Sequence, residues 1–318
     1  MGAVLLRIVG VLLILTAIAV PLSRAPDRAV ETLVARWAPP PSDFVDVKGQ
    51  LVHLRDEGPR DDPVPLLLLH GTSASLHTWE GWVKALRPQR RVITLDLPGF
   101  GLTGPYSDQT TAQADYSGDA YARFVLEVLD VLKVQRVAIG GNSLGGEVAW
   151  RIASLAPARV DRLVLVDAAG LPFEPESIPL GFLIARVPLL NRIGEELLPR
   201  ALVAQGVVNV YGHPEKVSAD LIDRYYELTL RAGNRRALGQ RMQQVDRGAD
   251  AARVAALKLP TLILWGGRDR LIPVKTARDF QAAIAGSELV VFDDLGHVPH
   301  EEDPARTVVP VKVFLGLR

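Results

Sequence analysis

The chain has 318 residues, and its 36 basic and 36 acidic residues give a formal net charge of zero. This balance offers no electrostatic footprint for nucleic acid, so we expect no nucleic-acid partner. The chain contains no cysteine, which excludes disulfides, thiolate catalysis and cysteine-ligated metal. Its six histidines show no H-E-x-x-H or similar spacing, so we expect no metal site and no other cofactor.

The first 22 residues are apolar, and Arg7 is the only charged residue among them. Counted from Gly2, this segment is about long enough to cross a bilayer as a helix. We therefore expect an N-terminal hydrophobic helix that anchors the protein to a membrane. The alternative is a cleaved signal peptide, with residues 8–15 as its apolar region and residues 17–19 as its cleavage site, which would export the protein. The flanking basic residues do not decide the orientation.

Residues 23–43 follow this segment and end in three consecutive prolines at positions 39–41. Proline-rich segments are stiff spacers, so we interpret residues 23–43 as a linker. Beyond it we expect a first core part at residues 44–170, a helical cap at residues 171–258 and a second core part at residues 259–318.

Short apolar segments rich in β-branched residues alternate with segments of helical periodicity, which is typical of a mostly parallel α/β sheet flanked by helices. Eight strands are expected near residues 44–48, 51–56, 65–70, 91–96, 135–140, 162–167, 261–265 and 288–292. Core helices are expected at residues 77–87, 116–132, 144–156, 274–284 and 303–315.

Gly141-Asn142-Ser143-Leu144-Gly145 lies between the strand that ends near Gly140 and the helix that begins at Leu144. A G-x-S-x-G sequence at such a junction is a nucleophile elbow, in which the serine adopts a strained conformation and the glycines relieve crowding. Ser143 is therefore the predicted nucleophile. The helix N-terminus behind it places the Leu144 N–H to stabilise an oxyanion.

A serine nucleophile needs a base and an orienting carboxylate, which in this pattern follow in the order acid, then histidine. Asp269 and His297 each come just after a predicted strand, and we assign them as acid and base. Asp167 ends another strand and stays open as the alternative acid. Two other histidines are set aside as candidate bases, since His53 is expected in an exposed strand and His300 at a solvated helix start.

The second oxyanion donor is expected in the loop after an early strand. Four leucines at residues 66–69 predict a central strand buried on both faces, and His70-Gly71 then starts an abrupt turn. We assign the backbone N–H of Thr72 to the oxyanion hole, with Ser73 as the alternative. His70 is expected to bond loop backbone.

The segment between Asp167 and Thr261 is much longer than one crossover between parallel strands requires. We expect it to form a helical cap over the carboxyl edge of the sheet. Residues 178–203 are rich in leucine, isoleucine and proline. Most of these side chains must dock the cap on the core, and some should line an acyl pocket.

Together, these motifs resemble the α/β-hydrolase superfamily, and the resemblance covers roughly residues 44 to 318. The motifs are His70-Gly71, Asp96-Leu97-Pro98-Gly99-Phe100-Gly101, the serine pentapeptide followed by Gly146, Trp265-Gly266-Gly267-Arg268-Asp269 and Gly296-His297. Within the superfamily the chain is similar to esterases, lipases and meta-cleavage-product hydrolases. The last group usually has a more glycine-rich oxyanion loop and a tryptophan where this chain has Val298.

The resemblance implies a serine carboxylesterase that acts on short- to medium-chain, uncharged carboxylic esters. A lipase, a lactonase or a carbon–carbon bond hydrolase of the same fold is the alternative enzyme. A ligand receptor that kept the triad but hydrolyses slowly is the alternative from another class. The partners expected are a small-molecule ester and, through the N-terminal segment, a membrane; the sequence does not indicate an oligomeric state.

Overall fold

The computed structural model describes residues 23–107, 114–245 and 250–317, together with positions 4, 6, 7, 10 and 21. The anchor or signal peptide expected at residues 1–22 lies outside the described residues, apart from those isolated positions. Among the helices that the structure describes, none is long and apolar enough to cross a membrane.

A single sheet runs through the core in the strand order β1-β2-β4-β3-β5-β6-β7-β8. The pairs β1–β2 and β2–β4 are antiparallel, and the remaining pairs are parallel. All eight predicted strands are present, so the predicted fold class is confirmed. Their bounds are β1 (Ser42–Val47), β2 (Gln50–Glu57), β3 (Leu66–Leu69), β4 (Val92–Leu95), β5 (Val137–Asn142), β6 (Val160–Val166), β7 (Thr261–Gly266) and β8 (Glu288–Phe292).

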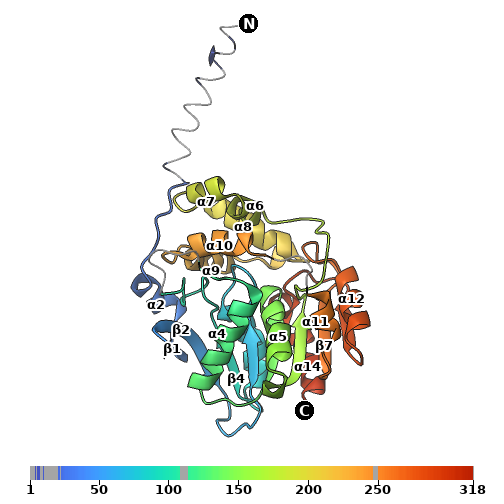
Figure 1. Ribbon diagram of the computed structural model, residues 1–318. Helices are drawn as coiled ribbons and strands as arrows, with labels where there is room; N and C mark the ends of the chain where they lie inside the picture. The colour runs from blue at the N-terminus through green and yellow to red at the C-terminus, as the bar shows by residue number, and fades with distance from the viewer. Residues whose placement is uncertain are drawn as a thin grey trace.

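Helices cover both faces of the sheet (Figure 1). One hydrophobic cluster joins one face of the sheet to α4 (Gly118–Val131), α5 (Leu144–Leu155) and α12 (Lys275–Ala283). A second cluster joins the other face to α3 (Glu80–Leu86) and α14 (Pro304–Phe314). The leucines of β3 contribute alternately to the two clusters, because successive side chains of a strand point to opposite faces. A continuous apolar strand is therefore buried on both sides.

The segment between β6 and β7 forms a cap of helices above the core (Figure 1). Its helices are α6 (Leu180–Arg186), α7 (Pro188–Gly194), α8 (Arg200–Val210), α9 (Ala219–Thr229) and α10 (Asn234–Gln243). The next helix, α11 (Ala251–Ala255), has returned to the core and packs against α5 and α12. The cap also contains the 3₁₀ turn η3 (Pro214–Lys216), between α8 and α9. Shorter elements elsewhere are α13 (Pro299–Glu302) and the 3₁₀ turns η1 (Leu76–Trp79) and η2 (Pro157–Arg159).

Residues 23–38, which we call the N-terminal strap, are folded against the cap, in contrast to the linker expected there. The strap contains α2 (Glu31–Trp37), and Leu33 of this helix is buried in a cluster with Leu228 of the cap. Trp37 Nε1 donates to Glu227 of α9 over 2.7 Å. A spacer-like composition was misleading here because the apolar side chains that bury the strap lie far away in the sequence.

Candidate active site

Ser143 is held in a strained conformation at the point where β5 becomes α5. Its backbone angles are φ 53° and ψ −116°, which a non-glycine residue adopts only when its surroundings enforce it. A Cβ at Gly145 would lie 2.1 Å from the Leu69 carbonyl oxygen, and one at Gly141 would lie 2.2 Å from the backbone of Gly145. The two glycines therefore let the helix approach the strands closely enough to form the predicted elbow.

His297 and Asp269, from the loops after β8 and β7, meet in a buried contact. His297 Nδ1 lies 2.6 Å from Asp269 Oδ2. The other carboxylate oxygen, Oδ1, accepts the N–H groups of Leu271 and Ile272 over 2.8 and 2.9 Å. Both oxygens of the carboxylate are thus held in place. A carboxylate fixed in this way can accept the imidazole N–H and orient the ring. The geometry favours Asp269 over Asp167 as the orienting acid.

Asp167 lies beside this pair in a fully buried position. One ligand atom from each of Asp167, Asp269 and His297 lies within 4.8 Å of the others. Asp167 Oδ1 accepts the Gly266 N–H over 2.9 Å. Burial, and then the neighbouring charge of Asp269, raise the pKa of Asp167 well above its usual value. The raised pKa favours the neutral form of Asp167 more than in water, which suits a supporting role.

Asn142 makes contacts that sequence reasoning did not identify. Its side-chain Nδ2 donates to the carbonyl oxygen of His297 over 2.9 Å and to that of Val166 over 3.2 Å. The amide therefore ties the histidine loop to the elbow. Glu302 anchors the same loop by accepting the Gly296 N–H over 2.9 Å. The only signal was the position of Asn142 inside the serine motif, which does not indicate a partner 155 residues away.

The loop assigned to the oxyanion hole lies directly against the elbow. A Cβ at Gly71 would be 3.2 Å from Cβ of Ser143, and Thr72 lines the same cavity as Ser143 and His297. His70 holds this loop: its Nε2 accepts the Leu97 N–H over 2.9 Å, and its Nδ1 donates to the Gly71 carbonyl over 2.7 Å. The expected structural role of His70 is confirmed.

Two other expectations about histidines were wrong. His53 is fully buried rather than exposed, with Nδ1 2.7 Å from Asp96 Oδ2. His300 is also fully buried, with its ring 4.0 Å from that of Trp79 and its Nε2 3.0 Å from Thr78 Oγ1. Both imidazoles are covered by segments remote in sequence, so local polarity was a poor guide to their exposure.

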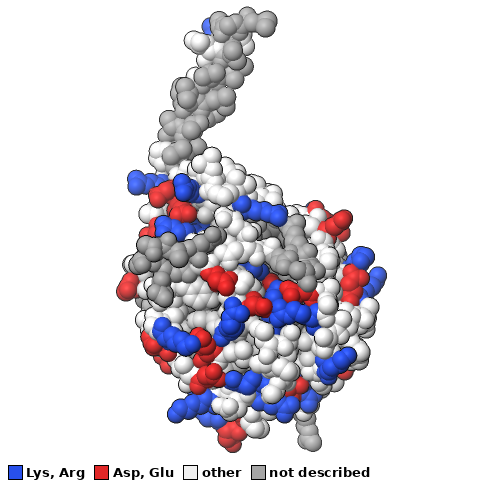
Figure 2. All heavy atoms as spheres, viewed as in Figure 1, with Lys and Arg blue, Asp and Glu red and all other residues white. Residues whose placement is uncertain are grey.

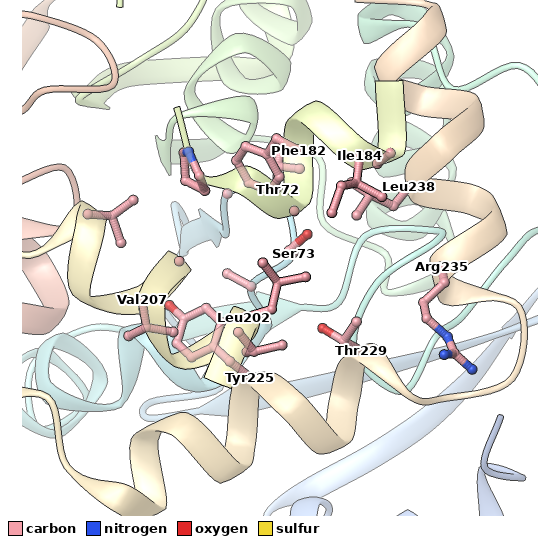
Figure 3. Close-up of a pocket in the computed structure, with 18 of the residues that line it drawn as sticks. Thr72, Ser73, Phe182, Ile184, Leu202, Val207, Tyr225, Thr229, Arg235 and Leu238 are labelled. Atoms are coloured by element: carbon pink, nitrogen blue, oxygen red, sulfur yellow. The ribbon is translucent and has the colours of Figure 1, made fainter. Parts of the chain in front are cut away.

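A cavity of about 170 Å³ opens from Ser143 into the cap. Figure 3 shows that its walls come from several cap helices, with Thr72 and Ser73 contributed by the core. The labelled cap residues are Phe182, Ile184, Leu202, Val207, Tyr225, Thr229, Arg235 and Leu238. Among the described lining residues, only Arg235 carries a permanent charge, and its guanidinium is paired with Asp27 of the strap over 2.6 Å.

A second cavity of about 130 Å³ also reaches Ser143 and Thr72. Its lining includes Leu171 and Phe182 from the start of the cap and Met242 of α10. Two spaces that meet at one nucleophile can hold the two halves of a molecule whose central bond is attacked there.

Residues 64–304 match the family model described as the alpha/beta hydrolase fold. The chain therefore belongs to the alpha/beta hydrolase family. An uncharacterised protein of Mycobacterium tuberculosis strain H37Rv is 33% identical over 302 residues, which cover 87% of this chain and 82% of that protein. The 2-hydroxymuconate semialdehyde hydrolase of Pseudomonas sp. strain CF600 is 31% identical over 260 residues, covering 79% and 86% of the two chains.

Solved structures agree with this fold. A meta-cleavage product hydrolase from Pseudomonas fluorescens IP01 superposes with a TM-score of 0.73 at 23% identity, covering 86% of this chain and 97% of that one. A membrane phospholipase A described as a bacterial virulence factor superposes with a TM-score of 0.68 at 26% identity. This second match covers 99% of this chain and 96% of that one.

Proposed function

We propose that the protein is a serine carboxylesterase that cleaves uncharged esters with short to medium acyl chains. The Ser143 hydroxyl attacks the ester carbonyl while His297 takes its proton, and Asp269 orients the imidazole. The N–H groups of Thr72 and Leu144 bind the oxyanion of the tetrahedral intermediate. His297 then protonates the departing alcohol. In the second half of the reaction, water attacks the acyl-enzyme while His297 takes its proton, and His297 then returns that proton to Ser143.

The observation that carries this proposal is the apolar character of the cavity that opens from Ser143. An acyl chain needs apolar walls and no unpaired charge, because burying an unpaired charge is strongly unfavourable. Arg235, the one permanently charged lining residue among those described, is already paired with Asp27. The second cavity at Ser143 supplies space for the alcohol half of the ester.

We also assign the apolar residues 2–22 to membrane attachment. Their length and composition support this assignment. The similarity to the membrane phospholipase A extends over 99% of this chain, which is consistent with a shared N-terminal organisation. Full-length protein should enter detergent and resist a high-salt wash; a mature N-terminus at Val20 would instead establish a cleaved signal peptide.

A carbon–carbon bond hydrolase is the second candidate, and the 31% identity to the 2-hydroxymuconate semialdehyde hydrolase favours it. Val298 and the glycine-poor loop after His70 argue against it, since both depart from the pattern that resemblance to those enzymes implies. Turnover of 2-hydroxymuconate semialdehyde faster than of any ester would establish this second candidate.

A series of p-nitrophenyl esters from acetate to palmitate tests the esterase proposal. We expect kcat/KM to rise towards butyrate or hexanoate by at most about fourfold per methylene, since burying one CH₂ contributes about 0.8 kcal/mol. It should then fall once the chain outgrows the cavity. A continued rise through palmitate, with activation at an oil–water interface, would indicate a lipase. A saturable thermal shift without turnover would indicate a receptor.

A further inference from the structure

The outer side of α6 and α7 exposes large apolar side chains, which we call the cap face. Their exposed fractions lie between 42% and 70% for Leu180, Leu183, Val187, Leu189, Leu190 and Ile193. Helices at a protein–water boundary normally present polar residues outward. Contiguous apolar surface of this kind marks a contact with another apolar phase. Figure 2 shows mostly uncharged surface over this part of the cap.

The charges on the cap face are all of one sign. Residues 178–194 contain Arg186 and Arg192 and no acidic residue, and both arginines are exposed. The chain as a whole is neutral, so this stretch departs from the average in both apolarity and sign. Arginines beside apolar side chains complement the phosphates and anionic headgroups at the surface of a bilayer.

The strap, which follows the apolar N-terminal sequence in the chain, begins next to the cap face. The Leu198 N–H donates to the Ser23 carbonyl and the Ala25 N–H donates to the Glu196 carbonyl, each over 3.0 Å. Asp27 pairs with Arg235 over 2.6 Å. Figure 1 shows this segment in blue, running from beside α7 down the side of the cap to α2. The strap therefore begins at the edge of the cap face.

The same two helices form one wall of the cavity that opens from Ser143. Phe182 and Ala185 of α6 and Gly194 of α7 line the cavity, while Leu189 of α7 and Val187 between the two helices are exposed. α6 and α7 are thus apolar on both sides. They separate the cavity from the outside by the thickness of a single helix layer.

We propose that the cap face docks on a lipid bilayer and that the substrate passes from the bilayer between α6 and α7 into the cavity. The occupant of the face is the headgroup and upper acyl region of an anionic membrane. The substrate class is then an amphiphilic ester that partitions into lipid. Only this substrate assignment rests on the proposed esterase function; the docking does not.

Fluorescence of single-cysteine variants tests the docking without any turnover. The chain has no cysteine, so Leu189→Cys and Val313→Cys can each carry one environment-sensitive dye. These positions are matched, at 70% and 74% exposure, but Val313 lies on α14 at the far end of the core from the cap (Figure 1). Full-length protein is reconstituted into vesicles of phosphatidylcholine with phosphatidylglycerol.

We expect a blue shift at position 189, quenched by spin-labelled lipid, and neither effect at position 313. Equal responses at the two positions, or no quenching at 189, would overturn the proposal. A blue shift at 189 that follows the protein-to-lipid ratio rather than the lipid quencher would mean that a second copy of the chain covers the face. That result would overturn it as well.

Activity of the double variant Leu189→Glu/Leu190→Glu tests the route of the substrate. Hydrolysis of a vesicle-dissolved ester should fall by about tenfold or more, because two leucines lose their burial. Hydrolysis of water-soluble p-nitrophenyl butyrate should stay within about twofold, and Val313→Glu should change neither rate. Equal loss on both substrates would refute entry from the bilayer. Absence of p-nitrophenyl butyrate turnover in the unmodified protein would refute only the esterase function.

Discussion

At the scale of single residues, the strained backbone of Ser143 is the feature most directly related to its proposed role as nucleophile. The φ of 53° sets the side chain at the tip of a sharp turn, and the following N–H of Leu144 starts a helix. Strain of this kind amounts to about 1–3 kcal/mol and persists only where the surroundings enforce it. Here the enforcement comes from the close approach of α5 to β3.

Substitutions at the three proposed catalytic residues should separate their roles. Ser143→Ala and His297→Ala should each reduce kcat by on the order of a million-fold, because nucleophile and base act as a unit. Asp269→Asn should lose less, about ten-thousandfold. Steady-state kinetics with p-nitrophenyl butyrate measures all three. Near-native turnover of Ser143→Ala would show that the elbow does not hold the nucleophile.

Asp167→Asn is the matched control for Asp269→Asn. Burial raises the pKa of Asp167, and an asparagine retains an oxygen able to accept the Gly266 N–H. Most activity should therefore remain in Asp167→Asn. If Asp167→Asn lost more activity than Asp269→Asn, the acid would have to be reassigned.

Buried histidines should make stability fall in mild acid. Burial lowers the pKa of His77 to about 4, and it also lowers the pKa values of His70 and His300. Between an unfolded value near 6.5 and these lower values, the unfolded state binds more protons than the folded state. Stability is then complete above pH ~6.5 and is lost as the pH falls towards 4.

Urea unfolding across this pH window checks the histidine prediction. His77→Gln removes one of the groups that must become protonated, so its stability should decline less steeply from pH ~6.5 to pH ~4.5 than that of the unmodified protein. The variant will start from a lower stability, because His77 bonds Ser75 and the Trp37 carbonyl. The comparison therefore concerns the slope, and identical slopes would contradict the assignment.

At the scale of elements, the packing of α5 against β3 sets the position of the oxyanion site. No side chain fits between the helix start and the Leu69 carbonyl. The Leu144 N–H therefore lies close to the loop that carries Thr72, because that loop follows β3 directly. The geometry of the proposed oxyanion hole is a consequence of one close helix–strand contact.

Gly145→Ala should disturb this contact. Its Cβ would lie 2.1 Å from a backbone oxygen, so α5 must shift and the variant should lose about 1–3 kcal/mol of unfolding free energy together with most activity. Gly181→Ala in α6 is the control for stability, since a Cβ there meets nothing within 4 Å. It should gain about 0.4–1 kcal/mol, because alanine reduces the conformational entropy of the unfolded chain. Equal stabilities of the two variants would contradict the packing argument.

At the scale of the whole molecule, the strap connects the N-terminal segment, the cap and the core. Trp37 bonds Glu227 of the cap through its indole, and its carbonyl accepts from His77 of the core over 2.7 Å. Leu33 is buried against Leu102 of the core and Leu228 of the cap. The strap thus fixes the cap in its position over the carboxyl edge of the sheet.

Two shortened chains should distinguish the strap from the apolar segment before it. A chain that begins at Ser23 should dissolve without detergent and keep its turnover of p-nitrophenyl butyrate. A chain that begins at Pro39 loses the burial of Leu33, so its unfolding temperature should fall by ~5 °C or more. Thermal denaturation monitored by circular dichroism measures both. Equal unfolding temperatures would show that the strap does not stabilise the cap.

The sequence by itself determined the order of strands and helices and the place of the elbow. These features depend on neighbouring residues: the apolar segment before Ser143, the helical spacing after it and the leucines of β3. Asp269 and His297 could be proposed for the same reason, since each follows a strand whose apolar pattern is local. Parallel strands then bring their carboxyl ends to one edge of the sheet.

Only the tertiary structure decided which of these groups touch. It placed Asp269 rather than Asp167 against His297, buried His53 and His300, and bonded Asn142 to a carbonyl 155 residues away. It also folded the strap onto the cap. Burial and hydrogen bonding of a polar side chain depend on the segment that covers it, and in each of these cases that segment is remote in the sequence.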